Sequence, residues 1–275
     1  MADSPLNDSL LAQRGRLDLA ATLAEAVGRM GDMARGAGPV LALTAVLALG
    51  VMLLPLVGGI EAGLLGLTLA VGLAAFGATT RIGTAIDLEN ARRLGLRPGG
   101  LLLGKPEARL AGATLLCTLF MLIMLALLML VALALFGGAG LNAEAVKNAD
   151  WAAVGPTWKL VLLAGVALVV LGAPVLFAVR LSLYAPATVG RGQMISLTAT
   201  GLTNRAILPL LAGLIVCALP GLIWLALVVT GFLGGKAVGV VAIVMLVLIQ
   251  WPLTSAFLGA AYRRLETHQL LGVWQ

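Results

Sequence analysis

The sequence predicts an all-α fold, a polytopic membrane protein with six transmembrane helices and cytoplasmic termini. Three observations support this prediction. The chain is 61% hydrophobic and only 11% charged over 275 residues, with a mean hydropathy of +1.07, which is far from the composition of a soluble domain. Six stretches reach the roughly 20 apolar residues that a membrane helix needs. The basic residues gather in alternate connections between these stretches.

The six apolar stretches define a transmembrane domain over residues 38–262, between an N-terminal segment (1–37) and a tail (263–275). Glycine pairs follow the first, third and fifth stretches, as expected of turns at a membrane surface. Two of these turns are short, so we expect helices one and two, and five and six, to form antiparallel hairpins. The stretches are 38–57, 60–80, 110–136, 159–179, 206–233 and 237–262.

Charge asymmetry gives the expected orientation. All 14 arginines and Lys105 lie in the N-terminal segment, in connectors 81–109 and 180–205, or in the tail, whereas the opposite side holds only three lysines. The positive-inside rule then predicts that the connectors and both termini are cytoplasmic.

The N-terminal segment carries an amphipathic pattern before the first span. Leu17, Ala20, Leu23, Val27 and Met30 recur at helical spacing with charged residues elsewhere on the wheel, which predicts a helix on the inner membrane surface.

Both long connectors predict further surface structure. Connector 81–109 is expected to form a helix from Ile82 until Gly95 and Pro98 end it. In connector 180–205, Pro186 is expected to stop the incoming helix, and the polar run 190–204 to form a short helix in the headgroup plane. Arginines of these connectors are the candidate contacts to anionic lipid headgroups; they are Arg92, Arg93, Arg97, Arg180, Arg191 and Arg205.

A stripe of small residues at four-residue spacing runs along the second span. Small side chains let membrane helices approach closely, so the stripe predicts helix packing, either within the chain or in a homodimer. Its members are Ala62, Gly66, Ala70, Ala74 and Ala78.

Prolines and a glutamine mark the candidate substrate-binding region. Pro220, Gln250 and Pro252 are expected near mid-membrane. Broken helices with a polar group at that depth are typical of transporter binding sites, although the same residues also fit a structural kink in which Gln250 bonds a carbonyl freed by proline.

Hydroxyl side chains on spans three and six are a second candidate. Thr114 and Thr118, with Thr254 and Ser255, are expected in the cytoplasmic half. They either line a shallow polar vestibule or bond carbonyls of their own helices.

Several function classes are disfavoured. No charged residue or histidine lies deep in any predicted span, which argues against ion-coupled carriers. The only histidine, His268, lies in the tail, and no catalytic motif is present, so we expect no enzymatic activity. The two cysteines lie in apolar runs without ligand-like neighbours, so no metal or cofactor is expected. The arginines flank apolar runs rather than forming a polar basic domain, which disfavours nucleic acid as a partner.

Three stretches resemble a group of bacterial six-helix inner-membrane proteins that includes the membrane domain of some glycerophosphoryl diester phosphodiesterases and the YciC-like proteins. They are the helix and first span beginning LDLAATLAEAVGRMGDMARG, connector 81–109, and RLSLYAPATVGRGQMISLTATGLTNRAILPLL. Arg180, Pro186 and Leu202-Thr203 fit the group's pattern, while Thr198-Ala199 and Gly201 depart from its tryptophan and basic residues. The resemblance implies an accessory membrane module of the bacterial inner membrane.

These patterns together predict a non-enzymatic bacterial inner-membrane protein. Its expected role is that of a scaffold or a part in envelope lipid homeostasis. The expected binding partners are anionic lipids on the cytoplasmic side and a protein partner or a second copy of the chain. The alternative is a carrier or flippase for a neutral or lipidic substrate that uses the kinked helices near Pro220, Gln250 and Pro252.

Overall fold

A computed structural model gives the fold of the chain. It describes residues 17–54, 58–101, 104–140, 143–148, 151, 156–193, 200–203, 206–230 and 235–272, and side chains only up to residue 266 in the last of these ranges. The fold is all-α, and six helices are long and apolar enough to cross a membrane. The predicted all-α fold with six membrane-crossing helices is confirmed, and the chain is a multi-pass membrane protein, while the cytoplasmic side of its termini stays a prediction.

The N-terminal part of the fold is a short helix followed by two long ones: α2 (Leu19–Gly28), α3 (Met30–Leu53) and α4 (Gly59–Thr84). Asp18 caps α2, since its side chain accepts a hydrogen bond from the Ala21 N–H at 3.1 Å. In α2, Thr22 and Ala26 are buried, while Val27 is 61% exposed. The side of α2 that packs on the protein is therefore not centred on the apolar face that the sequence predicts.

Connector 81–109 contains several short elements instead of one helix from Ile82. Helix α4 runs on to Thr84, and a new helix, α5 (Leu88–Arg93), begins after Asp87, whose carboxylate accepts the Asn90 N–H at 2.7 Å. A 3₁₀ turn, η1 (Pro98–Gly100), then leads to α6 (Lys105–Gly138). The Asp87 cap restarts the helix, which explains why the predicted helix is divided.

Pro186 does not stop the incoming helix, as the sequence predicts it to do. Helix α8 (Thr157–Leu181) ends before it, and Pro186 lies in the first turn of α9 (Tyr184–Arg191). A proline is tolerated there because the first N–H groups of a helix have no partner within the helix. About half of the predicted surface helix over 190–204 lies outside the described residues, which include the end of α9 and α10 (Thr200–Thr203) but neither 194–199 nor 204–205.

The remaining elements are α7 (Ala143–Lys147), which lies between α6 and α8, and a C-terminal helical pair. The pair consists of α11 (Ile207–Val229) and a long composite helix made of α12 (Lys236–Val244), the π-helical turn η3 (Met245–Gln250) and α13 (Trp251–Gly272). The π turn comes directly before Pro252, where the α-helical ladder loses a donor.

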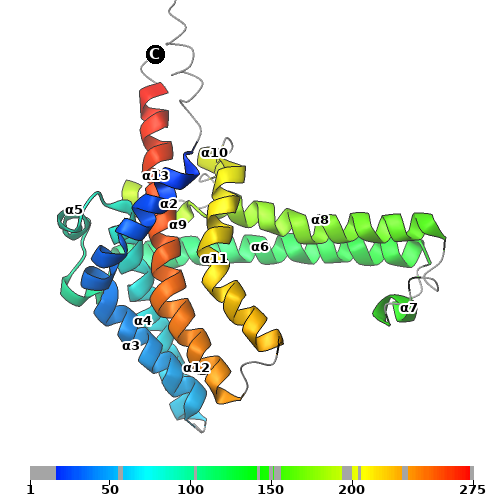
Figure 1. The fold of residues 1–275 in the computed structure, drawn as a ribbon, viewed down its shortest axis with the longest axis horizontal. Helices are drawn as coiled ribbons and strands as arrows, with labels where there is room; N and C mark the ends of the chain where they lie inside the picture. The colour runs from blue at the N-terminus through cyan, green and yellow to red at the C-terminus, as the bar shows by residue number, and fades with distance from the viewer. Residues whose placement is uncertain are drawn as a thin grey trace, which may run out of the picture.

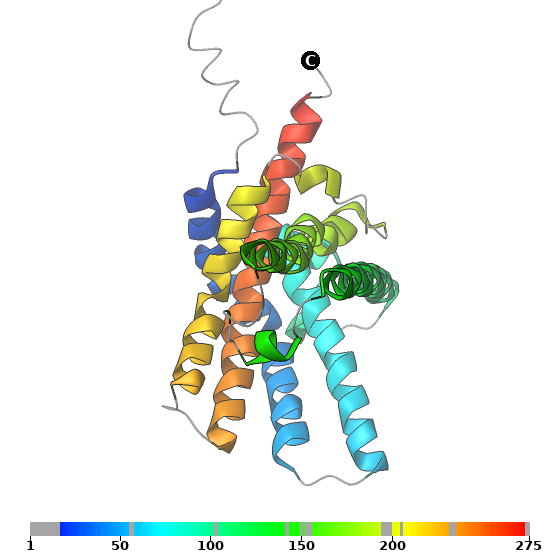
Figure 2. The ribbon, with the colours of Figure 1, turned by 90° about the vertical axis from the view of Figure 1, so that its right-hand side faces the viewer.

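The long helices run in two directions (Figures 1 and 2). Helices α3, α4 and α11 and the composite helix lie alongside one another and, with α2, form what we call the body. Helices α6 and α8 form a hairpin, the arm, that runs crosswise to the body and carries α7 at its tip. Six apolar helices are thus present, but they do not share one direction.

Most buried side chains of the body lie toward one end, where α2, the end of α4 and α13 meet (Figure 1). There α4 and α13 approach so closely that a Cβ on Gly259 would lie 2.2 Å from the backbone of Gly83. Likewise, Phe257 is fully buried against Gly213 of α11. Small residues permit this close approach. We call this end, with α5, α9 and the first turns of α6, the basic end.

Candidate functional site at the basic end

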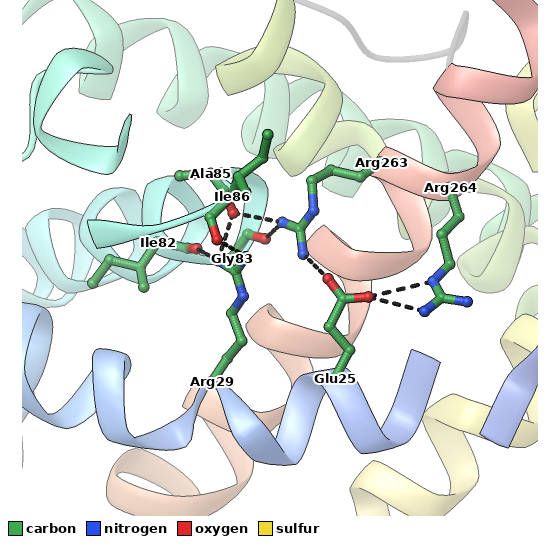
Figure 3. A network of polar contacts seen from close by, with 8 residues as sticks. All are labelled: Glu25, Arg29, Ile82, Gly83, Ala85, Ile86, Arg263 and Arg264. Carbon is green, nitrogen blue, oxygen red and sulfur yellow. Dashed lines mark hydrogen bonds and ion pairs between the residues drawn. The ribbon is translucent and has the colours of Figure 1, made fainter. Parts of the chain in front are cut away.

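Two arginines cap the C-terminal end of α4 (Figure 3). The Arg29 guanidinium, between α2 and α3, donates to the carbonyl oxygens of Ile82, Ala85 and Ile86. Arg263 of α13 donates to the carbonyls of Gly83 and Ala85, the latter at 2.8 Å. The last carbonyls of a helix lack partners within it and carry partial negative charge, so two cations stabilise this end.

Glu25 connects this cap to the C-terminal helix (Figure 3). One carboxylate oxygen accepts from Arg263 at 2.5 Å, and the other from Arg264 at 3.1 Å. Burial raises the pKa of Glu25, but the hydrogen bonds and charges of the two arginines outweigh that effect and bring the pKa below its usual 4.5. The first and last described helices are therefore tied together at the end of α4.

A buried ion pair attaches the arm to the body. Arg81 of α4 and Glu107 of α6 have side chains 2% and 1% exposed, and Arg81 Nη2 donates to Glu107 Oε1. Arg81 Nε also donates to the Leu94 carbonyl at 3.1 Å, and Glu107 Oε2 accepts the Gly104 N–H at 3.0 Å. Both charged groups thus have additional hydrogen-bond partners, which a buried pair needs to offset desolvation.

The two basic connectors meet beside this ion pair. Arg109 Nη1, in the second turn of α6, donates to the carbonyl of Gly192 at 2.6 Å. One turn further along α6, the Thr114 and Tyr184 hydroxyls lie 2.9 Å apart. Connector 81–109 and connector 180–205 therefore form one surface at the root of the arm.

A cavity of about 290 Å³ lies in this junction. Its walls come from the ends of α4 and α5, the first turns of α6 and the C-terminal turn of α9, and three of its lining residues are arginines. The lining residues are Arg81, Arg93, Leu94, Gly95, Pro106, Arg109, Thr188, Val189 and Gly192. Gly95 and Gly192 have φ values of +94° and +63°, left-handed conformations that favour glycine.

The candidate headgroup arginines divide between this cavity and its surroundings. Arg93 lines the cavity, while Arg92 and Arg97 are exposed on the same connector. Arg191 pairs with Glu266 of α13 at 3.1 Å, and Arg180 is half-buried at the end of α8. Arg205 lies outside the described residues.

The candidate substrate residues lie where α11 faces η3. A Cβ on Gly221, next to Pro220, would lie 2.4 Å from Gln250 Oε1, so the glutamine packs directly on α11. Gln250 Oε1 and Trp224 Nε1 are buried atoms without a hydrogen-bond partner among the described residues. Pro252, two residues further on, is buried. The arrangement supplies one donor and one acceptor at a break in the helical ladder.

The hydroxyl candidates bond to different neighbours. Thr114 bonds Tyr184 of α9 and its own helix, and Thr254 donates to the Gln250 carbonyl at 2.8 Å within its own helix. Ser255 donates to Thr79 of α4 at 3.3 Å, and Thr118 is exposed. The predicted vestibule stays a prediction.

The small-residue stripe of α4 has two different halves. Ala74 and Ala78 are buried against the body, whereas Ala62 and Gly66 are exposed and Ala70 is half-buried. The buried half fits packing within the chain. A Cβ on Gly66 would meet no atom within 4 Å, so the exposed half remains open for lipid or a second copy.

Sequence reasoning missed Arg81, Glu107 and Arg109 as members of a site. Arg81 and Arg109 were expected only as the two ends of a connector, and Glu107 only as one charge among others. A usable signal was present in GKPEAR, where a proline and a glutamate follow a glycine at the spacing of a helix start. That pattern places Glu107 in the first turn of α6, but not its partner.

Comparisons of the chain with known protein families, with curated proteins and with solved structures found no match.

Proposed function

We propose that this chain is a non-enzymatic, multi-pass protein of a bacterial inner membrane that binds anionic lipid through its basic end. In this role it serves as a scaffold or takes part in envelope lipid homeostasis. The observation that carries the proposal is the meeting of the two basic connectors, joined by the hydrogen bond from Arg109 to Gly192. Two segments about 80 residues apart in sequence thereby present their arginines on one surface.

Charge and position support the same proposal. Of the 18 basic residues, 15 belong to the segments expected on the cytoplasmic side, and the negative surface potential of that leaflet attracts such clusters by about 1 kcal/mol per residue near the surface. Arg92 and Arg97 are exposed at this end. The resemblance to six-helix inner-membrane proteins favours an accessory role over a catalytic one.

Native mass spectrometry of the full chain, released from its own membrane in mild detergent, tests the proposal. We expect stoichiometric retained anionic phospholipid, and a reduced amount in the Arg92→Glu/Arg97→Glu variant. Retained neutral phospholipid alone contradicts the proposal. A retained polypeptide in place of lipid contradicts lipid binding and indicates that the chain is a subunit of a protein complex.

A carrier for a neutral or lipidic substrate is the second candidate, and Gln250 is the observation that favours it. Its buried oxygen, at the end of a π turn and packed against Gly221 of α11, has no hydrogen-bond partner among the described residues. Such breaks often occur at functional sites in membrane helices. Gln250→Leu separates the two candidates. Loss of activity with normal folding supports the carrier, and an unchanged phenotype supports the scaffold.

A further inference from the structure

We infer that the cavity at the root of the arm is a binding site for a phosphate group carried by a lipid headgroup. This inference rests on the proposed function and assigns one defined place to the anion. The cavity brings arginines from three helices together: Arg81 of α4, Arg93 of α5 and Arg109 of α6. Arginine donates several N–H groups in a fixed fork, a geometry that matches phosphate oxygens.

The three arginines of the cavity are neutralised by carboxylates to different degrees. This difference identifies the arginines that are available to bind an anion. Arg81 is neutralised by the buried Glu107, so it shapes the floor and adds little net charge. Arg93 pairs with Glu89 at 3.2 Å, but both side chains are about three-quarters exposed, and such a pair contributes little and exchanges readily. Within the described residues Arg109 has no carboxylate partner and donates only to a carbonyl. Two cations therefore face an anion that enters the cavity.

The cavity's position fits a headgroup. Arg109 immediately precedes the apolar run of α6, which begins at Leu110 and continues with exposed leucines such as Leu115. A phosphate bound at Arg109 thus lies at the depth where polar and apolar parts of the helix meet, and its acyl chains follow the uncovered face of the arm.

The volume of the cavity also fits a phosphate headgroup. A volume of about 290 Å³ is at the lower limit of small-molecule sites. It accommodates a phosphate headgroup and excludes the acyl chains. Thr188, the two glycines and three apolar residues, Leu94, Pro106 and Val189, line the rest of the wall. The missing side chains at Gly95 and Gly192 let a ligand approach the backbone.

The experiment is native mass spectrometry of the purified full chain titrated with short-chain phosphatidic acid, phosphatidylcholine or inorganic phosphate. We expect phosphatidic acid to bind best. Arg109→Ala and Arg93→Ala should each weaken it roughly tenfold, as expected for loss of one charge-assisted hydrogen bond. Lys105→Ala is the matched control, because Lys105 is exposed on α6 one turn before Arg109 and does not line the cavity.

Each outcome decides the inference. Binding of inorganic phosphate alone, with the same dependence on Arg109, supports a phosphate site and assigns it to a soluble ligand. Equal losses from Lys105→Ala and Arg109→Ala overturn the cavity and leave a general basic surface, so the proposed function survives. No preference for phosphatidic acid in any variant overturns both. If Arg109→Ala does not fold, Arg93→Ala carries the test, since its described side-chain partner is the exposed Glu89.

Discussion

The arm is built from more apolar helices than the body, and the two are held in place by different means. In the most apolar 18-residue stretch of each helix, a third of the residues of α3 and α4 are buried, 11% in α11, 6% in α6 and none in α8. The composite helix also has 6% there, but its buried residues lie beyond that stretch, in α13. Leu168 of α8 is 73% exposed, while Leu210 of α11 is fully buried. The core of the body is formed by contacts between its own helices, whereas the arm leaves its apolar side chains exposed along nearly its whole length.

The difference shows which contacts hold the arm in its position relative to the body. Its polar contacts with the rest of the chain lie at its root, through the Arg81–Glu107 pair, the Arg109 hydrogen bond and the Thr114–Tyr184 pair. Helices that point in such different directions do not all follow one membrane normal (Figure 1). The orientation of the arm relative to the body is therefore set by a few contacts at the basic end.

Breaking the buried ion pair gives the largest expected effect. Glu107→Ala leaves the Arg81 charge buried without its partner and should cost about 3–5 kcal/mol of unfolding free energy. Thermal unfolding in detergent, followed by circular dichroism, measures it. The Arg81→Met/Glu107→Leu variant removes both charges and should lose much less. An equal loss in the two variants would mean that the pair contributes through packing and not through charge.

The closest backbone approach in the body gives the next largest effect. Gly259→Val places a side chain against the Gly83 backbone and should destabilise the protein by about 1–3 kcal/mol. Gly66→Ala on the exposed half of the stripe is the control, since no atom lies within 4 Å of the added Cβ. A comparable loss from Gly66→Ala would show that another chain packs on this half.

The Glu25 bridge should make stability depend on pH. Because the folded-state pKa of Glu25 is below 4.5, the bridge contributes fully above the unfolded value and is lost as the pH falls below 4.5 toward the folded value. Glu25→Gln should cost about 1 kcal/mol of unfolding free energy at neutral pH and reduce the loss of stability below pH 4.5. Melting temperatures of both proteins at pH 7, 5, 4 and 3 measure this loss. The same loss in the variant as in the unchanged protein would exclude Glu25 as its cause.

The smallest expected effect tests whether lipid alone covers the arm. Leu168→Ala should change the unfolding free energy by no more than about 0.5 kcal/mol, whereas Leu210→Ala, its buried counterpart, should cost about 2–5 kcal/mol. The same unfolding measurement serves both. A cost at Leu168 that approaches the one at Leu210 would contradict lipid as the only neighbour and indicate a protein partner on the arm.

The six apolar helices were predictable because each needs only local information: enough consecutive apolar residues and a turn at each end. The kinked region was also partly predictable, since Gln250 ends the π turn that the structure contains and Pro252 follows it by two residues. The interruption at Asp87 was not foreseen, although an aspartate followed by a short polar run is an ordinary helix start. Pro186 misled the prediction because a proline ends one helix and begins another equally well.

The cavity could not be predicted from the sequence, for another reason. Arg81 and Glu107 are 26 residues apart, and Arg109 and Gly192 are 83 apart, so their contacts depend on how α4, α6 and α9 cross. Hydropathy places each arginine at a membrane surface but not beside a particular neighbour. The crosswise direction of the arm is undetermined for the same reason, since an apolar helix suits lipid in any orientation.

The cap on α4 also bears on biosynthesis. Gly83 accepts its hydrogen bond from Arg263, a residue that the ribosome adds 180 positions later. Until then the nascent chain has only Arg29 to occupy the carbonyls at this helix end. Closure of the basic end therefore requires that translation has passed Arg263, and a chain shortened before this residue leaves the Gly83 carbonyl without its arginine donor.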